Sequence, residues 1–136
     1  MSVAVAHQPS ATGHHLTLQE GAKEASLRKT SLSVIQVAEG VDVDLLEDQR
    51  TRQRREIAKI LDDARLAHLE WDLHLTTGVE VAETVLDHVE QNDVELLVIG
   101  ARRRSAVGKL IMGSVTQSIL LRAAVPVLVV KPPARS

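Results

Sequence analysis

The sequence has no cysteine, phenylalanine or tyrosine and only one tryptophan, Trp71. The lack of cysteine excludes disulfide bonds and cysteine-ligated metal sites. A single aromatic residue also cannot supply the stacked rings on which single-stranded nucleic acid is usually bound. No apolar run approaches the roughly 18 residues of a membrane-spanning helix, and the first residues lack the charged start and apolar block of a signal peptide. These absences predict a soluble cytoplasmic protein with no membrane partner.

The charges of the chain are nearly balanced, with a formal net charge of −2 over 136 residues. Such a balance gives no general attraction to nucleic acid. Four arginines between residues 50 and 55 could suggest a basic patch, but Glu47, Asp48 and Glu56 offset much of that charge, which favours an exposed helix of mixed charge. Hydrophobic residues make up 44% of the chain. Length and composition together predict one globular domain over residues 1–136, with no nucleic acid partner.

Strand and helix patterns alternate along the chain. Short apolar runs predict strands, and apolar residues at helical spacing predict helices. The expected strands are residues 2–6, 32–37, 69–75, 94–99 and 127–130, and the expected helices are residues 16–29, 46–68, 79–91 and 115–123. Connections of this length exclude hairpins and require parallel strands with right-handed crossovers. The sequence therefore predicts an α/β fold, in which a parallel five-stranded sheet carries helices on both faces.

The stretch from residue 94 to residue 131 contains the main candidate site. Its first strand ends at Gly100, and the loop 101–112 carries four cations: Arg102, Arg103, Arg104 and Lys109. The loop leads to a helix for which Ser114 is the expected N-cap and Gln117 the expected partner in a capping box. Free amide groups, the positive end of a helix dipole and cationic side chains together favour an anion such as phosphate. The stretch therefore predicts a βαβ unit with an anion-binding loop.

Gly100 is followed thirteen positions later by Gly113 and Ser114, and this spacing resembles the motif G-x2-G-x9-G-S/T of nucleotide-binding members of the universal stress protein family. The resemblance implies a Rossmann-like, doubly wound sheet with strand order 3-2-1-4-5, and a ligand crevice between the first and fourth strands. It also implies a stress-response protein that binds ATP or a related adenine nucleotide. The expected site residues are Gly100, Arg102, Arg103, Lys109, Gly113, Ser114 and Val115.

Two positions differ from the family's pattern. The second motif glycine falls on Arg103, so a position free to adopt φ > 0 is lost, although the guanidinium can pair with phosphate. The aspartate that commonly helps to hold the nucleoside is also missing, because alignment places Ala6 or His7 there. Neither residue accepts hydrogen bonds from two ribose hydroxyls as a carboxylate does. We therefore expect a nucleotide site of altered motif, with weaker or differently directed binding.

Catalysis and metal binding have little support in the sequence. Ser114 and Ser105 have no histidine or acid placed to activate them, so no enzyme is expected. The adjacent His14 and His15 would point about 100° apart on a helix and could not both ligate one metal. The acidic residues between positions 39 and 48 lack the spacing of a calcium loop. No metal is predicted from protein ligands.

The final strand predicts a homodimer. Its residues Val127, Leu128, Val129 and Val130 are all apolar, and the resemblance places the strand at the edge of the sheet. An exposed apolar edge favours pairing with another chain, and the prolines before and after the strand limit that pairing to a few residues. Many members of the family form dimers through the corresponding edge. The alternative function is a dimeric stress protein that acts through protein contacts and has lost nucleotide binding.

Overall fold

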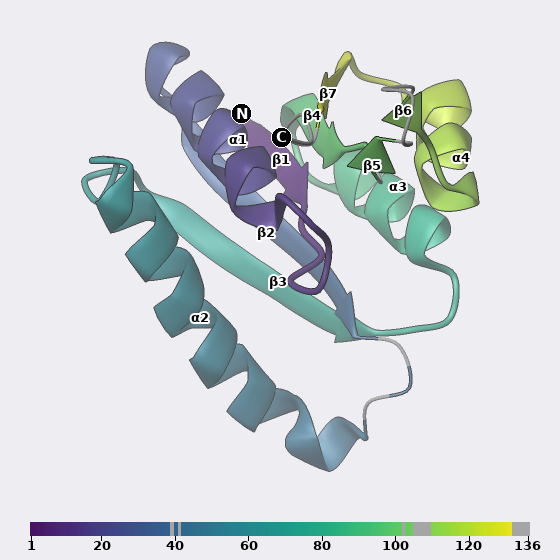
Figure 1. Cartoon of the computed structure of the whole chain (residues 1–136), viewed down its shortest axis with the longest axis horizontal. Helices are drawn as coiled ribbons and strands as arrows, with labels where there is room; N and C mark the ends of the chain where they lie inside the picture. Colours follow the sequence, from purple (N-terminus) through teal and green to yellow (C-terminus); the bar gives the residue numbers. More distant parts are fainter. Residues whose placement is uncertain (39, 41, 102, 105–109, 132–136) are drawn as a thin grey trace.

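Five strands form one parallel sheet (Figure 1). The computed structural model describes residues 1–38, 40, 42–101, 103–104 and 110–131, of which 103–104 and 110–111 only by their backbone. The strands are β1 (Ser2–Ala6), β2 (Ser31–Ala38), β3 (Trp71–Thr77), β4 (Val94–Gly100) and β7 (Val127–Val130). Their order is β3-β2-β1-β4-β7, and all neighbouring pairs are parallel. The predicted fold class and the strand order 3-2-1-4-5 are confirmed, with β7 as the fifth strand.

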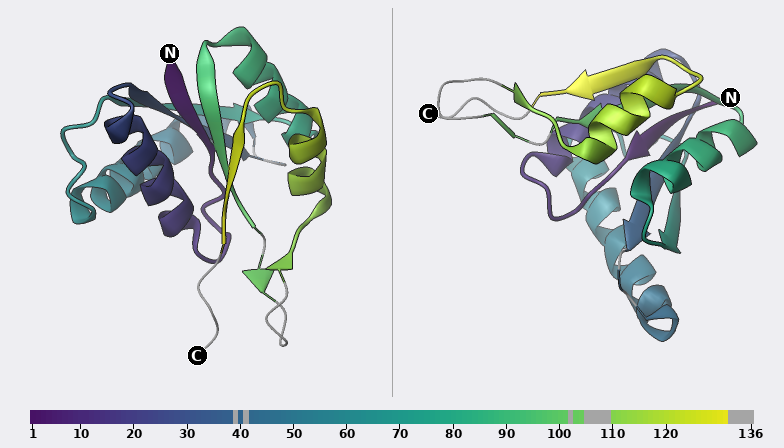
Figure 2. Two further views of the ribbon diagram at one scale, coloured as in Figure 1. Left: turned by 90° about the horizontal axis from the view of Figure 1, so that it is seen from above. Right: turned by 90° about the vertical axis from the view of Figure 1, so that its right-hand side faces the viewer.

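Helices cover both faces of this sheet, as Figure 2 shows. They are α1 (His14–Leu27), α2 (Leu46–Asp63), α3 (Val81–Gln91) and α4 (Ser114–Arg122), and a 3-10 turn, η1 (Val43–Leu45), precedes α2. Strand β1 separates the two cores: Val3 and Val5 pack with α1 and α2, whereas Ala4 packs with α3 and α4. Successive side chains of a strand point to opposite faces, so one short apolar strand supports both layers.

Helix α1 lies very close to β1 at Gly21. A Cβ atom added to this glycine would lie only 2.1 Å from Val5 Cγ2. In sequence terms Gly21 only lowers the helix propensity of residues 16–29. In the fold, glycine at this position lets the helix approach the sheet.

Helix α2 ends earlier than the sequence predicted. Apolar spacing extended the helix to His68, but it ends at Asp63, and His68 is exposed outside it. Arg65 adopts φ 61°, and the N–H of Leu66 donates to the carbonyl of Leu61 at 2.8 Å. This is the Schellman motif, in which one left-handed residue, most often glycine, ends a helix. The predicted boundary was wrong because arginine occupies that position here, so no local glycine marked the end.

Other boundaries differ by fewer residues. Helix α1 begins at His14 instead of residue 16, and α3 begins at Val81 instead of residue 79. The region predicted as the loop 101–112 contains a short antiparallel pair, β5 (Arg103–Arg104) with β6 (Leu110–Ile111). Strands of two residues are too short to show an apolar period, so the sequence could not predict this pair.

Candidate functional site

A pocket of about 250 Å³ lies at the carboxyl ends of β1 and β4. The chain leaves β1 toward α1 on one face of the sheet and leaves β4 toward α4 on the other. In a doubly wound sheet this reversal opens the crevice in which ligands bind. The pocket is lined by Ala6, His7, Gln8, Ala11, Thr12, His14, Thr17, Ile35, Val37, Val81, Val85, Ile99, Gly100, Ala101, Gly113, Ser114, Val115, Thr116 and Ile119.

The start of α4 forms one wall of this pocket. The expected capping box is wrong: Gly113 is the N-cap residue, Ser114 is already helical, and no described side chain caps the helix. Gln117 Nε2 donates instead to the carbonyl of Met112, 3.2 Å away. The first amide groups of a helix have no partners inside the helix and carry the positive end of its dipole. Because no side chain among the described residues caps this helix, its first amides are available to an anion in the pocket.

Gly100 lies where β4 approaches α1. A Cβ atom on this residue would lie 2.7 Å from Oγ1 of Thr17, a buried side chain of α1. Glycine at position 100 therefore lets α1 of the protein itself approach β4 closely. Both residues line the pocket, so a larger residue at position 100 would displace part of its wall.

A row of hydrogen-bonded polar side chains, largely buried, borders the pocket on the α1 side. His7 is 2% exposed, its Nε2 lies 2.9 Å from His14 Nδ1, and Gln36 Nε2 lies 2.8 Å from His7 Nδ1. Gln36 Nε2 also donates to Gln53 Oε1 at 3.0 Å. Burial, and to a lesser extent the neighbouring His14, lowers the pKa of His7 to about 4. A neutral imidazole therefore occupies the region where the resemblance would place a carboxylate.

Gln36 and Gln53 were not predicted as site residues from the sequence. Leu32, Val34 and Gln36 are alternate residues of β2, so the side chain of Gln36 lies on the same face of the strand as these two core residues and points inward. A polar residue at an inward position of a strand is a signal that could have been recognised. Gln53 carries no comparable signal, because its role depends on how α2 packs against β2.

Four of the predicted site residues come together in the pocket: Gly100, Gly113, Ser114 and Val115. Arg102 and Lys109 lie outside the described residues, and Arg103 is placed only by its backbone in β5. The roles of these three cations stay predictions. Among the described residues that line the pocket there is no carboxylate, and the titratable side chains are His7 and His14.

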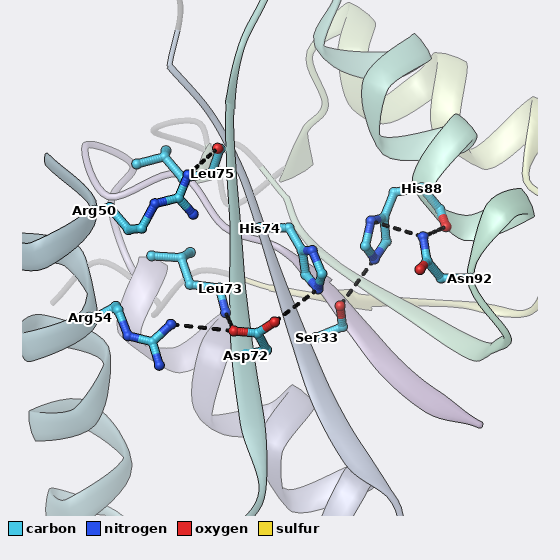
Figure 3. A network of polar contacts seen from close by, with 9 residues as sticks. All are labelled: Ser33, Arg50, Arg54, Asp72, Leu73, His74, Leu75, His88 and Asn92. Atoms are coloured by element: carbon cyan, nitrogen blue, oxygen red, sulfur yellow. Dashed lines mark hydrogen bonds and ion pairs between the residues drawn. The ribbon is translucent and has the colours of Figure 1, made fainter. Parts of the chain in front are cut away.

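A second polar cluster joins α3 to the sheet (Figure 3). Ser33 Oγ of β2 lies 3.0 Å from His88 Nε2, a distance that would suit a catalytic pair. However, Asn92 Nδ2 lies 3.3 Å from His88 Nδ1 and also donates to the carbonyl of His88 at 2.9 Å. Because this amide donates to Nδ1, the imidazole carries its proton on Nε2 and cannot accept one from Ser33. Burial, and then the nearby His74, lowers the pKa of His88.

The described part of the chain holds no group of three or more histidine, cysteine or acidic side chains that could ligate a metal ion. His14 bonds to His7 instead of pairing with His15. In the same part of the chain, no helix has both the length and the apolar character needed to cross a membrane.

Comparisons with known proteins match this architecture. The model of the universal stress protein family matches residues 1–131. A universal stress protein from Mycolicibacterium smegmatis is 36% identical over 115 residues, which cover 85% of this chain and 86% of that protein. Universal stress protein YxiE from Bacillus subtilis is 26% identical over 132 residues, which cover 94% of this chain and 86% of that protein.

Solved structures show the same similarity. A universal stress protein from Archaeoglobus fulgidus superposes with a TM-score of 0.74 at 28% identity, covering 95% of this chain and 97% of its own. The structure of the universal stress protein from Archaeoglobus fulgidus in complex with dAMP has a TM-score of 0.69 at 24% identity, covering 95% of this chain and 96% of its own.

Proposed function

We propose, because this chain belongs to the universal stress protein family, that it is a stress-response protein whose pocket binds ATP or a related adenine nucleotide. It acts as a dimeric binding and regulatory module and not as an enzyme. The phosphates are held by the start of α4 and the loop after β4. The residues assigned to this site are Gly100, Arg102, Arg103, Lys109, Gly113, Ser114 and Val115.

One observation carries the nucleotide proposal: the pocket at the strand reversal reaches the uncapped first turn of α4. Free amides at a helix start bind phosphate, and the apolar side chains of Ile35, Val81 and Val85 offer a surface for a base. A pocket of about 250 Å³ suits a small ligand such as a nucleoside monophosphate better than a large one. Two structures of this fold were solved with dAMP and with cAMP, so adenine nucleotides are the first probes to test.

The phosphate position is tested by Ser114→Glu. The variant places a carboxylate on the first turn of α4 in the pocket, where it would take the amides itself and repel a phosphate. We expect the dissociation constant for AMP, measured by calorimetry, to rise by about ten- to a hundredfold, the equivalent of one lost hydrogen bond to a charged group.

Gln117→Glu is the matched control for this charge. It adds the same carboxylate to the same turn, and both positions are exposed, but Gln117 does not line the pocket. Its affinity for AMP should stay within about threefold of the parent. Equal loss in both variants, or no loss in Ser114→Glu, would place the ligand elsewhere. No binding of AMP or ATP by the parent at millimolar concentration would refute the nucleotide proposal.

The dimer is proposed from the open edge of β7. Among the described strands β7 pairs with β4 alone, and its four apolar residues are all partly exposed. Leu121 of α4, the helix that precedes β7 in the chain, is a further apolar residue that is 86% exposed. An apolar edge strand of four residues suits a closed twofold pairing with a second copy.

Leu128→Lys is expected to convert the dimer to a monomer. In an antiparallel twofold pairing, an added lysine lies near the same lysine of the partner, and like charges across strands repel. Light scattering at high micromolar concentration measures the mass directly. Ala124→Lys adds the same charge at an exposed position just before the strand and should leave the dimer intact. A monomeric parent, or an unchanged dimer in a folded Leu128→Lys variant, would rule out this interface.

The absence of a carboxylate from the described pocket lining favours one alternative, a dimeric stress protein that acts through protein contacts without nucleotide. The two functions differ in what the purified protein carries. Mass spectrometry and the ultraviolet spectrum of the denatured protein would show whether a nucleotide copurifies. Absence of a copurified nucleotide, combined with no binding in calorimetry, would favour the alternative.

A further inference from the structure

The described residues leave one buried oxygen of Gln36 without a hydrogen-bond partner. The side chain is 2% exposed, and its Nε2 uses both protons, toward His7 Nδ1 and toward Gln53 Oε1. Its Oε1 receives no hydrogen bond from any described residue. Buried acceptors are rarely left in this state, because the loss of water is then not compensated.

The orientation assigned to the Gln36 amide, with Nε2 toward His7, sets where the two histidines carry their protons. Because Gln36 donates to His7 Nδ1, His7 carries its proton on Nε2 and donates it to His14 Nδ1. His14 then carries its own proton on Nε2 and is neutral. A second proton on His14 would sit on Nδ1 and face the proton of His7 at 2.9 Å between the nitrogens. In this arrangement His14 cannot become charged in place.

A half-turn of the Gln36 amide gives a second arrangement. Oε1 then accepts from Nδ1–H of His7, and His7 Nε2 accepts from Nδ1–H of His14. The amide of Gln53 turns as well, so that it donates to the same Oε1. His14 can now hold both protons and carry a positive charge beside the pocket. The unpartnered position is then taken by Gln36 Nε2, so this arrangement is costly in the free protein. An anion in the pocket would offset the cost by its attraction to the charged His14.

We propose that the pocket binds its phosphate ester together with one proton, which His14 accepts while the amides of Gln36 and Gln53 turn. The inference rests on the proposed nucleotide function and makes it more specific, because it selects dianionic ligands and makes affinity depend on pH. His14 is the proton acceptor since His7, with a pKa lowered to about 4, stays neutral.

His14 has no charged neighbour in the described pocket lining that could take up the proton in its place. The described lining contributed by β2, α3, β4 and α4 contains no charged side chain. Helix α2 contributes the neutral Gln53, which is hydrogen-bonded to Gln36. His15, whose ring centroid lies 5.9 Å from that of His14, is exposed and does not line the pocket. No carboxylate of the described lining competes for the proton.

Calorimetry of AMP binding at pH 7.5, in two buffers of different ionisation enthalpy, measures the proton uptake. At this pH a phosphate monoester is already close to fully dianionic, so uptake is assigned to the protein. We expect uptake of a measurable fraction of one proton, and an affinity that falls by up to about tenfold for each pH unit between pH 7 and pH 8.5. The variant His14→Asn, which can still accept from His7 but cannot be charged, should show neither effect. His15→Asn should behave as the parent does.

A second readout is the tautomer of His7, from the nitrogen chemical shifts of its ring. The proton is expected on Nε2 in the free protein and on Nδ1 with AMP bound, a change that a purely structural histidine would not show. AMP binding without proton uptake and without this tautomer change would overturn the inference while leaving the nucleotide proposal intact. Failure of the parent to bind AMP at all would overturn both. The tautomer measurement uses the parent protein, so it decides the question even if His14→Asn does not fold.

Discussion

Replacing Gly21 by alanine is expected to destabilise the protein by about 2 to 4 kcal/mol, although the same change inside a helix normally stabilises it by roughly 1 kcal/mol. The added Cβ would lie 2.1 Å from Val5 Cγ2. Val5 is β-branched and completely buried in the core between β1 and α1, so its methyl group has no free space to enter. Helix α1 would have to move away from the sheet. Urea unfolding would show the change as a lower midpoint with a similar slope.

Gly78→Ala is the matched control for this substitution. A Cβ atom there would meet its nearest neighbours, Thr84 Oγ1 and Val37 Cγ1, at 3.6 and 3.7 Å, which is ordinary contact. Its effect should stay within about 1 kcal/mol. Combining Gly21→Ala with Val5→Ala should cost less than the sum of the two single changes, because the smaller residue makes room for the new Cβ. A midpoint for Gly21→Ala at or above that of the parent would show that the helix is not held by this contact.

Acidification from pH 7 to pH 4 is expected to remove about 3 kcal/mol of stability through His7 alone, since its pKa is about 4 in the folded protein and 6.5 in the unfolded chain. Between these values the unfolded chain binds more protons than the folded one, so the free energy of unfolding increases with pH. The contribution is complete above pH 6.5 and is lost as the pH falls to 4. The pKa of His88 is also lowered, by burial and then by His74, so this residue adds to the loss in the same direction.

Urea unfolding at pH 7, 5.5 and 4.5 measures this dependence. His7→Asn should be less stable than the parent at pH 7, because it loses packing and hydrogen bonds, but its stability should change less with pH. His15→Asn, at an exposed position beside the same pocket, should keep the full pH dependence of the parent. An unfolding free energy of the parent that is equal at pH 7 and pH 4.5 would mean that His7 is protonated freely in the folded protein.

The candidate site was predictable where its signals are local in sequence. Gly100 and the pair Gly113 and Ser114 follow one another in a short stretch between two apolar strands, and all three line the pocket. The role assigned to Ser114 as a cap was wrong, because the same residue can lie one position before or inside a helix, and only the backbone conformation of Gly113 distinguishes the two. Gln36 and Gln53 were missed because their partners lie far away in sequence.

The strand order in the sheet and the position of the crevice were implied by the family resemblance. By itself the sequence determined the order of strands and helices along the chain and the parallel character of the sheet. Apolar periodicity reports which side of each element must be buried, and long connections exclude antiparallel hairpins, so these features depend on neighbouring residues only. The tertiary structure alone decided where α2 ends, why Gly21 is needed inside a helix, and how burial keeps His7 neutral beside Gln36. Local periodicity encodes none of these features. The end of α2 depends on the left-handed conformation of Arg65. The need for Gly21 depends on a methyl group of Val5, and the surroundings of His7 depend on the buried amide of Gln36.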